Sequence, residues 1–340
     1  MHTSSASVRF GIYLPSFFST SRDQPSLQHL CAYAQHAEAV GFDSVWVIDH
    51  LIRAAPSYRV TWYEPFTVLS AVLAHTQCIA LGTGILVLPL RHPVLTAKTV
   101  ATLDVLSQGR VIFGVASGWH PQEFEACQVP LQTRGRRCDE ALELMKRLWT
   151  EDRVTYQGAH FHCTDLSLEP KPFQSPHPPI WIGGGTWHPQ QATHITGRGW
   201  SPQAVLRRIA RLGNGLCTSY RAIYRQDTSL IRRDWEQICA YAESYGRDPM
   251  TITRAHQDHL YIVSAQDRDR RRAAEVVARY TPLALADAEA LYLLGTPDQL
   301  LPRIAARVDA GIRYLLLHPL VHDLEQLDRF AEEIMPHFRP

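Results

Sequence analysis

The sequence predicts an α/β protein built as a (β/α)8 TIM barrel with insertions, and three observations support that fold class. Apolar segments rich in β-branched residues recur along the chain, and helical patterns separate them. The length of 340 residues also suits one barrel, because such barrels typically run to about 250 residues or more. No low-complexity tract or change of composition divides the chain. We therefore expect residues 1–340 to form a single domain.

The clearest unit lies between residues 79 and 119. The runs IALGTGILVLP and VIFGVASG both have the apolar character of strands that are buried on both faces. Between them, residues 93–106 repeat apolar side chains at helical spacing, starting at Pro93, which a first helical turn tolerates, and stopping before Gly109. A strand, a helix and a second strand in succession predict a parallel sheet.

The other elements follow in order. Strands are predicted at residues 8–14, 44–48, 79–86, 111–116, 179–182, 215–218, 251–262 and 314–317, and helices at 27–40, 93–106, 136–149 and 202–212. Gly41 is expected to end the first helix as a left-handed cap. Insertions near 151–178, which contain a hairpin at 154–168, and near 187–200 break the alternation. Because long loops in compact domains are commonly functional, we expect both near the barrel mouth.

Charge and cysteine usage narrow the class of function. A formal net charge of +1 offers no electrostatic basis for binding nucleic acid or an anionic membrane surface, so a small organic substrate is expected. The 7 cysteines are scattered, without the spacing of a metal site or a redox pair. The N-terminus lacks an apolar signal segment, and no apolar run is long enough to cross a membrane. We expect a cytoplasmic protein without a bound metal.

Candidate site residues follow the predicted strands, where barrels carry their chemistry. Asp49 and His50 follow the second strand, and a histidine can give and recover a proton near neutral pH. Ser117, Gly118 and Trp119 follow the fourth strand. The run of Gly183, Gly184, Gly185 and Thr186 follows the fifth, and it forms either a tight turn or a set of backbone N–H groups directed at a phosphate. Among the aromatic residues, Phe17, Trp62 and Trp119 are expected to line a pocket for an apolar or planar organic molecule.

In these segments the chain resembles the bacterial luciferase-like family of flavin- and deazaflavin-dependent oxidoreductases. The resemblance lies in the order of FGIYLP, EAVGFDSVWVIDH, LGTGILVLPLRHP, TLDVLSQGR, FGVASGW, RGRRCDEALELMKRLWT, LEPKPFQSPHPPIWIGGG and AGIRYLLLHPL. It implies a barrel that binds reduced FMN or the 5-deazaflavin coenzyme F-420.

The resemblance also implies roles for particular residues. A non-proline cis peptide, which backs the flavin ring in relatives, is expected at Gly84–Ile85. Asp49 and His50 match an acidic residue and a histidine beside the flavin, and the glycine run matches a loop by the phosphate of the deazaflavin. Ser117 stands where luciferases have a phosphate-binding arginine, and Trp119 stands where sugar-phosphate dehydrogenases have a catalytic glutamate. Those two roles do not transfer.

The leading expectation is therefore a monooxygenase that uses reduced FMN and oxygen on a small organic substrate. His50 and Asp49 are its expected catalytic residues. A separate reductase could supply the reduced flavin. The alternative is hydride transfer with F-420, for which Arg198, Arg207 and Arg208 could form a basic groove. A non-catalytic flavin-binding subunit is a third hypothesis. Relatives usually dimerise through helices beside strands two to four, so we expect a homodimer with residues 93–106 partly at its interface.

Overall fold

Eight parallel strands close into a barrel in the computed structural model, which describes residues 7–339 except 54–56, 190–200, 224 and 265–266. The ring closes because β1 pairs with both β14 and β3, while β10 pairs with both β7 and β11. The barrel strands are β1 (Arg9–Tyr13), β3 (Ser44–Val47), β5 (Ala80–Thr83), β7 (Val111–Ala116), β10 (Ile180–Gly183), β11 (Gly215–Ser219), β12 (Thr253–Ile262) and β14 (Tyr314–Pro319). The predicted (β/α)8 barrel is confirmed.

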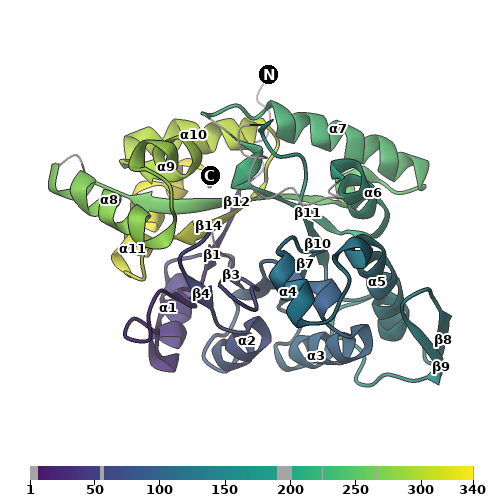
Figure 1. Cartoon of the computed structure of the whole chain (residues 1–340). Helices are drawn as coiled ribbons and strands as arrows, with labels where there is room; N and C mark the ends of the chain where they lie inside the picture. The colour runs from purple at the N-terminus through teal and green to yellow at the C-terminus, as the bar shows by residue number, and fades with distance from the viewer. Residues whose placement is uncertain (1–6, 54–56, 190–200, 224, 265–266, 340) are drawn as a thin grey trace.

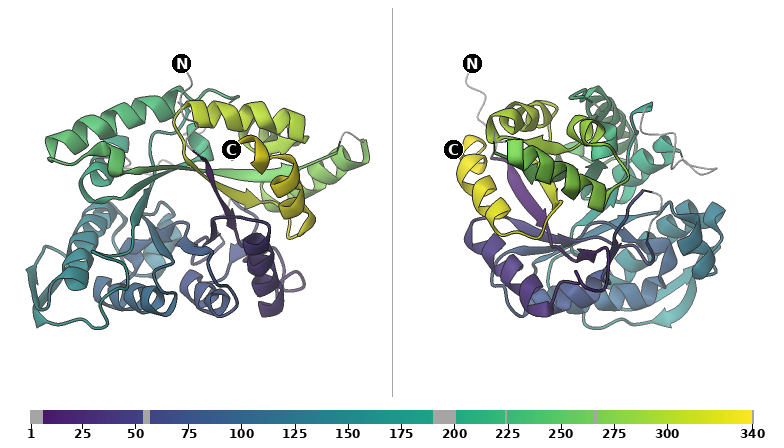
Figure 2. Two further views of the ribbon diagram at one scale, coloured as in Figure 1. Left: turned by 180° about the vertical axis from the view of Figure 1, so that it is seen from behind. Right: turned by 60° about the vertical axis from the view of Figure 1, so that its left-hand side comes forward.

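Helices surround this barrel (Figures 1 and 2). They are α1 (Leu27–Ala39), α2 (Pro65–Leu73), α3 (Pro93–Leu106), α4 (Pro121–Ala126), α5 (Arg134–Thr150), α6 (Pro202–Leu212), α7 (Ser229–Ser244), α8 (Asp267–Tyr280), α9 (Leu285–Leu291), α10 (Pro297–Asp309) and α11 (Glu325–Glu333). Side-chain caps set several of the helix starts, since Ser26 accepts from the His29 N–H at α1 and Thr296 forms a capping box with Gln299 at α10. Gly41 has a φ of +93°, which confirms the left-handed position after α1.

The interior of the barrel is filled by aromatic side chains that stand opposite glycines. Trp46 occupies the space where a Cβ on Gly82 would lie, and Trp181 does the same for Gly215. Trp46 and Trp181 stack with ring centroids 5.2 Å apart. Apolar layers between the strands and the surrounding helices complete the core. Glycines on the inward faces of the strands thus make room for a core of large rings.

The structure differs from the sequence-based expectation in one strand and in the position of one insertion. The strand predicted at 79–86 is interrupted at Gly84–Ile85 and resumes as β6 (Leu86–Val87), which pairs only with β7. The predicted hairpin is confirmed as β8 (Val154–Gln157) and β9 (His162–Leu166). It does not lie at the mouth as expected, because it packs beside α5 at the outer edge of the molecule (Figure 1). Residues 190–200 of the second insertion lie outside the described residues.

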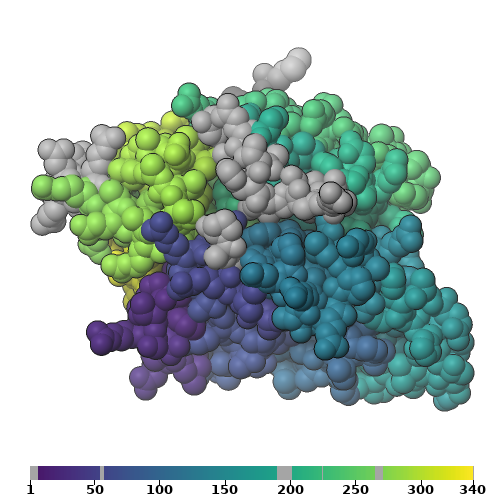
Figure 3. Space-filling model, viewed as in Figure 1, coloured from purple at the N-terminus to yellow at the C-terminus, as the bar shows by residue number. Residues whose placement is uncertain are grey.

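Short elements build one end of the barrel. The antiparallel pair β2 (Phe17–Phe18) and β4 (Thr61–Trp62) brings Phe17 opposite Trp62, and β13 (Leu293–Gly295) extends the sheet beside β12. Figure 3 shows the chain's N-terminal half below and its C-terminal half above on this face. A cluster of aromatic side chains, which includes Phe17, Trp62 and Tyr280, packs beneath these elements.

Candidate active site

One cavity lies at the carboxyl ends of the barrel strands and collects most of the expected site residues. Its lining consists of Ile48, Asp49, His50, Tyr58, Trp62, Gly84, Ile85, Val87, Ala116, Ser117, Gly118, Trp119, Gly183, Gly184, Trp187, Cys217, Ser219, Tyr220, Arg221 and Gln257. Six barrel strands or the loops that follow them contribute to this list. We name this space the mouth cavity.

The floor of the mouth cavity is formed by backbone at Gly84–Ile85, and the peptide bond between these residues is cis, as expected. Tyr13 lies directly beneath, so closely that a Cβ on Gly84 would come within 2.6 Å of its hydroxyl oxygen. Gly183 stands opposite, where a Cβ would lie 3.0 Å from the Ile85 side chain. Glycine at these two positions therefore lets Tyr13 and the Ile85 side chain pack closely under and beside the cavity.

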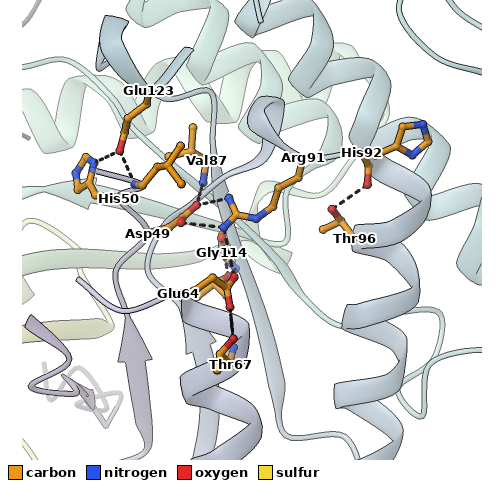
Figure 4. Close-up of polar contacts among 12 residues, drawn as sticks. Asp49, His50, Glu64, Thr67, Val87, Arg91, His92, Thr96, Gly114 and Glu123 are labelled. Atoms are coloured by element: carbon orange, nitrogen blue, oxygen red, sulfur yellow. Dashed lines mark hydrogen bonds and ion pairs between the residues drawn. The ribbon is translucent and has the colours of Figure 1, made fainter. Parts of the chain in front are cut away.

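Asp49 is fully engaged by neighbouring groups. Arg91 donates to both carboxylate oxygens, at 2.6 and 2.9 Å, and the Val87 N–H donates to one of them at 2.8 Å. Figure 4 shows the Asp49 carboxylate pointing at Arg91, which also approaches Glu64. This partly buried ion pair, together with the Val87 N–H, holds the chain just after the cis bond against the end of β3.

His50 points to a different partner, Glu123 on α4 (Figure 4). The distance from His50 Nδ1 to Glu123 Oε1 is 3.1 Å, and the same oxygen accepts from the Leu51 N–H at 2.7 Å. Burial raises the pKa of Glu123, but the hydrogen bonds from His50 and Leu51, together with the electrostatic influence of His50 and His120, outweigh burial, so its pKa lies below the ordinary value. Glu123 is therefore ionised at neutral pH.

The glycine run is satisfied largely within the protein. Gly184 donates its N–H to the Cys217 carbonyl oxygen at 3.1 Å. Thr186 donates both its N–H, at 2.6 Å, and its hydroxyl, at 2.7 Å, to the buried carboxylate of Asp234 on α7. A carboxylate thus occupies the position where we expected Thr186 to meet a phosphate. Gly183 and Gly184 line the mouth cavity, whereas Gly185 and Thr186 do not.

Arg221 is the only arginine or lysine among the described residues that line the mouth cavity. Its guanidinium lies over the rings of Trp187, at 5.4 Å, and Tyr220, at 5.1 Å. It has no carboxylate partner among the residues that the structure describes. Tyr58 and Tyr220 are the polar groups that influence Arg221 electrostatically, and their hydroxyl oxygens lie 3.2 Å apart. A cation held by aromatic faces without a counterion is suited to bind an anionic group of a ligand.

The expected aromatic pocket is only partly assembled. Trp62 and Trp119 line the mouth cavity, and their rings lie 5.0 and 5.6 Å from the ring of His50. Trp62 Nε1 is buried without a hydrogen-bond partner in the described structure, so it is a donor available to a ligand. Phe17 instead lines a second cavity beside α8, with Tyr280 and His322. The structure therefore does not bring Phe17 to the site.

Sequence reasoning missed several residues of this cavity. The sequence assigned no role to Glu123, Arg221 or Arg91. The segment HPQEFEA, which carries Glu123 and Glu125, is the one signal that could have indicated Glu123, because a carboxylate in the first turn of a helix after a strand end can turn back to the site. The hypothetical basic groove is not supported at Arg208, which is buried against Asp139 at 2.6 Å, or at Arg207, which lies over Tyr241. Arg198 lies outside the described residues.

The described residues contain no group of three or more histidine, cysteine, aspartate or glutamate side chains placed to hold a metal ion. Among the described helices, none combines the length and the apolar character needed to cross a bilayer.

Comparison with known proteins identifies the family. The model of the luciferase-like monooxygenase family matches residues 8–314, so the chain belongs to that family of enzymes. It is 27% identical to an F420-dependent glucose-6-phosphate dehydrogenase of Amycolatopsis mediterranei, over 95% of this chain and 98% of the relative. It is also 27% identical to an FMNH2-dependent dimethylsulfone monooxygenase of Pseudomonas putida, over 89% of this chain and 85% of the relative.

A solved structure agrees with the fold. A monooxygenase from Streptomyces bottropensis superposes with a TM-score of 0.77 at 23% identity, over 97% of this chain and 99% of that chain. The family and the barrel predicted from the sequence are both confirmed. The relatives include both cofactor classes that the resemblance implied.

Proposed function

We propose that the protein is a flavin-dependent monooxygenase that takes reduced FMN and acts on a small organic substrate in the mouth cavity. The observation that carries this proposal is the juxtaposition of the Gly84–Ile85 floor with His50, whose Nε2 has no hydrogen-bond partner among the described residues. When bound, reduced FMN would supply the electrons that activate oxygen.

The residues present fit such a cofactor. Gly84 and Gly183 line the mouth cavity and add no side chain of their own to it, and Trp62 Nε1 offers an unpaired donor. His50 can accept a proton at Nε2, and Trp62 and Trp119 exclude water beside it. Asp49 acts through Arg91 and Val87, which it holds in place, and not by exchanging a proton itself. We assign Arg221 to an anionic group of the ligand, either a cofactor phosphate or an acidic substrate.

Hydride transfer with F-420 is the second candidate. The F420-dependent relatives favour it, since they match 95% or more of this chain. Three features argue for the first candidate: Trp119 replaces the glutamate of the sugar-phosphate enzymes, Arg208 is unavailable, and Asp234 closes the turn at Thr186.

The deciding experiment is titration of the purified protein with reduced FMN and with F-420, followed by fluorescence. Binding of reduced FMN together with oxygen consumption in the presence of substrate supports the first candidate. Tight binding of F-420 without binding of reduced FMN would reverse the order. Binding of either cofactor with no turnover by any substrate, and no loss on His50→Ala, would favour a non-catalytic subunit.

The same proposal includes the assembly and location of the protein. The chain acts as one domain, in the cytoplasm, as a homodimer, with a separate reductase supplying the flavin. All 7 cysteines are free, which suits a reducing compartment. Apolar side chains exposed on α3 support the proposed dimer interface.

A further inference from the structure

The two ring nitrogens of His50 lie in different environments. Nδ1 contacts Glu123 Oε1 at 3.1 Å, on the side away from the mouth cavity. Nε2, at the other edge, has no partner in the described structure, and His50 belongs to the cavity lining. The rings of Trp62, Trp119 and Tyr58, with centroids 5.0, 5.6 and 6.1 Å away, restrict the orientation of the imidazole. Its two nitrogens are therefore not interchangeable.

The charge state of Glu123 decides which nitrogen carries the proton. An ionised carboxylate accepts hydrogen bonds and cannot donate one. Glu123 Oε1 also accepts from the Leu51 N–H at 2.7 Å, which fixes the position of that oxygen. Nδ1 must then be the donor in the contact with Glu123, and a neutral His50 carries its single proton on Nδ1. That leaves a lone pair on Nε2, at the edge of the ring opposite Glu123, on a residue that lines the mouth cavity.

We propose that Glu123 is a positioning residue that locks His50 in the Nδ1–H tautomer, so that His50 meets the substrate as a proton acceptor at Nε2. The inference rests on the proposed function for its catalytic meaning, but the tautomer itself is a property of the ligand-free protein. It specifies the class of ligand, since the group beside Nε2 must bear an O–H or N–H that can donate. A neutral histidine free in water favours the opposite tautomer, so the lock has an observable signature.

A second observation supports a role in the site over a role in stability. Glu123 has no exposed area, and its Oε2 atom has no hydrogen-bond partner in the described structure. Buried polar atoms are nearly always paired, and an unpaired one reduces stability. A glutamate kept in that position at α4 is better explained by what its other oxygen does for His50. Without the contacts to His50 and the Leu51 N–H, an apolar residue would suit the position better.

The test is ¹⁵N NMR of histidine-labelled, ligand-free protein at a pH where the imidazoles are neutral, with the His50 signals assigned by their loss in His50→Asn. We expect Nδ1 of His50 to be of the protonated type and Nε2 of the unprotonated type. Glu123→Gln, which retains an acceptor oxygen, should keep this tautomer. Glu123→Leu, which is similar in size and lacks an acceptor, should shift His50 to the Nε2–H form.

The signals of His256 provide an internal control for folding, because its Nδ1 contacts Thr218 Oγ1 at 2.7 Å, away from Glu123. An Nε2–H tautomer in the wild type, or an unchanged tautomer in Glu123→Leu with His256 unperturbed, would overturn the proposal. Once a substrate is known, Glu123→Leu should lower kcat at least tenfold with little change in KM, and Glu123→Gln should recover most of it. Failure of the cofactor titrations would leave the NMR result intact, so the two proposals are separable.

Discussion

At the scale of single residues, the role proposed for Arg221 can be tested by measuring the affinity for FMN. It lies in the mouth cavity over two aromatic rings and has no carboxylate partner in the described structure. If Arg221 binds the cofactor phosphate, Arg221→Met should weaken FMN binding at least tenfold, because charge-assisted hydrogen bonds contribute about 1.5–3 kcal/mol. Fluorescence titration measures this directly.

Riboflavin, which lacks the phosphate, is the matched control for Arg221. Its affinity should be the same for the wild type and Arg221→Met. An unchanged affinity for FMN would assign Arg221 to the substrate, and a raised KM for an acidic substrate would then be the expected effect. Equal weakening of FMN and riboflavin would show that the substitution merely disturbs Trp187 and Tyr220, and would contradict an anion site.

His259 gives a prediction about pH. It is fully buried among Tyr220, Tyr280, Tyr292 and His318, and neither of its ring nitrogens has a partner in the described structure. Burial lowers its pKa far below the ordinary 6.5, so the folded protein keeps the ring neutral while the unfolded chain protonates it in acid. The contribution of His259 to the free energy of unfolding is thus fully present above about pH 6.5. Below that pH the free energy of unfolding falls by about 1.4 kcal/mol per pH unit for such a histidine.

The substitution His259→Phe should separate this effect from packing. Urea unfolding at pH 7.5 should give a free energy within about 1.5 kcal/mol of the wild type, since the change is close to volume-conserving and removes unpaired polar atoms. Between pH 7.5 and 5.5 the variant should lose about 1.4 kcal/mol less than the wild type. His318, whose pKa burial lowers to about 3, accounts for part of the remaining slope. Equal slopes in both proteins would refute the assignment.

At the scale of the elements, the contact between β5 and β7 depends on a glycine. A Cβ on Gly114 would lie 2.0 Å from the Thr83 carbonyl oxygen, and the Thr83 hydroxyl already donates to the Gly114 carbonyl oxygen and accepts from its N–H. Because a backbone atom blocks the position, Gly114→Ala should destabilise the protein by about 3 kcal/mol, at the upper end of overpacking effects. The measurement is the urea midpoint at constant m-value.

Gly135 is the corresponding control. It lies in α5, where a Cβ would meet its nearest atom at 3.4 Å, an ordinary contact. Gly135→Ala should therefore leave stability unchanged or raise it by up to about 1 kcal/mol. Comparable losses in both variants would mean that Gly114 has no special packing role.

At the scale of the whole molecule, α3 exposes the apolar side chains that a dimer interface requires. Leu95 and Leu106 are 70% and 64% exposed. Exposed apolar patches commonly mark protein–protein contacts. The wild type is expected to sediment as a dimer, and Leu95→Asp with Leu106→Asp to sediment as a monomer. Met250→Asp, at an equally exposed apolar residue (76%) just before β12, should remain a dimer. A monomeric wild type at working concentration would refute the homodimer.

The sequence by itself determined the barrel and the ends of strands at which its chemistry lies. Apolar β-branched runs alternating with helical patterns are local signals, and they identified all eight barrel strands and the exact bounds of α3 and α6. Residues that directly follow strands, such as His50 and Trp119, were found for the same reason. Parallel strands in a barrel place their carboxyl ends at one rim, so sequence position alone puts these residues together.

Only the tertiary structure decided which partners those residues take. The contacts of His50 with Glu123 and of Thr186 with Asp234 join residues 73 and 48 positions apart in the chain. No periodicity encodes such contacts, because they depend on how loops from different strands pack over the rim. The sequence therefore placed Asp49, Phe17 and the glycine run near a site, and packing decided that Asp49 binds Arg91, that Phe17 lines another cavity, and that a carboxylate closes the glycine turn.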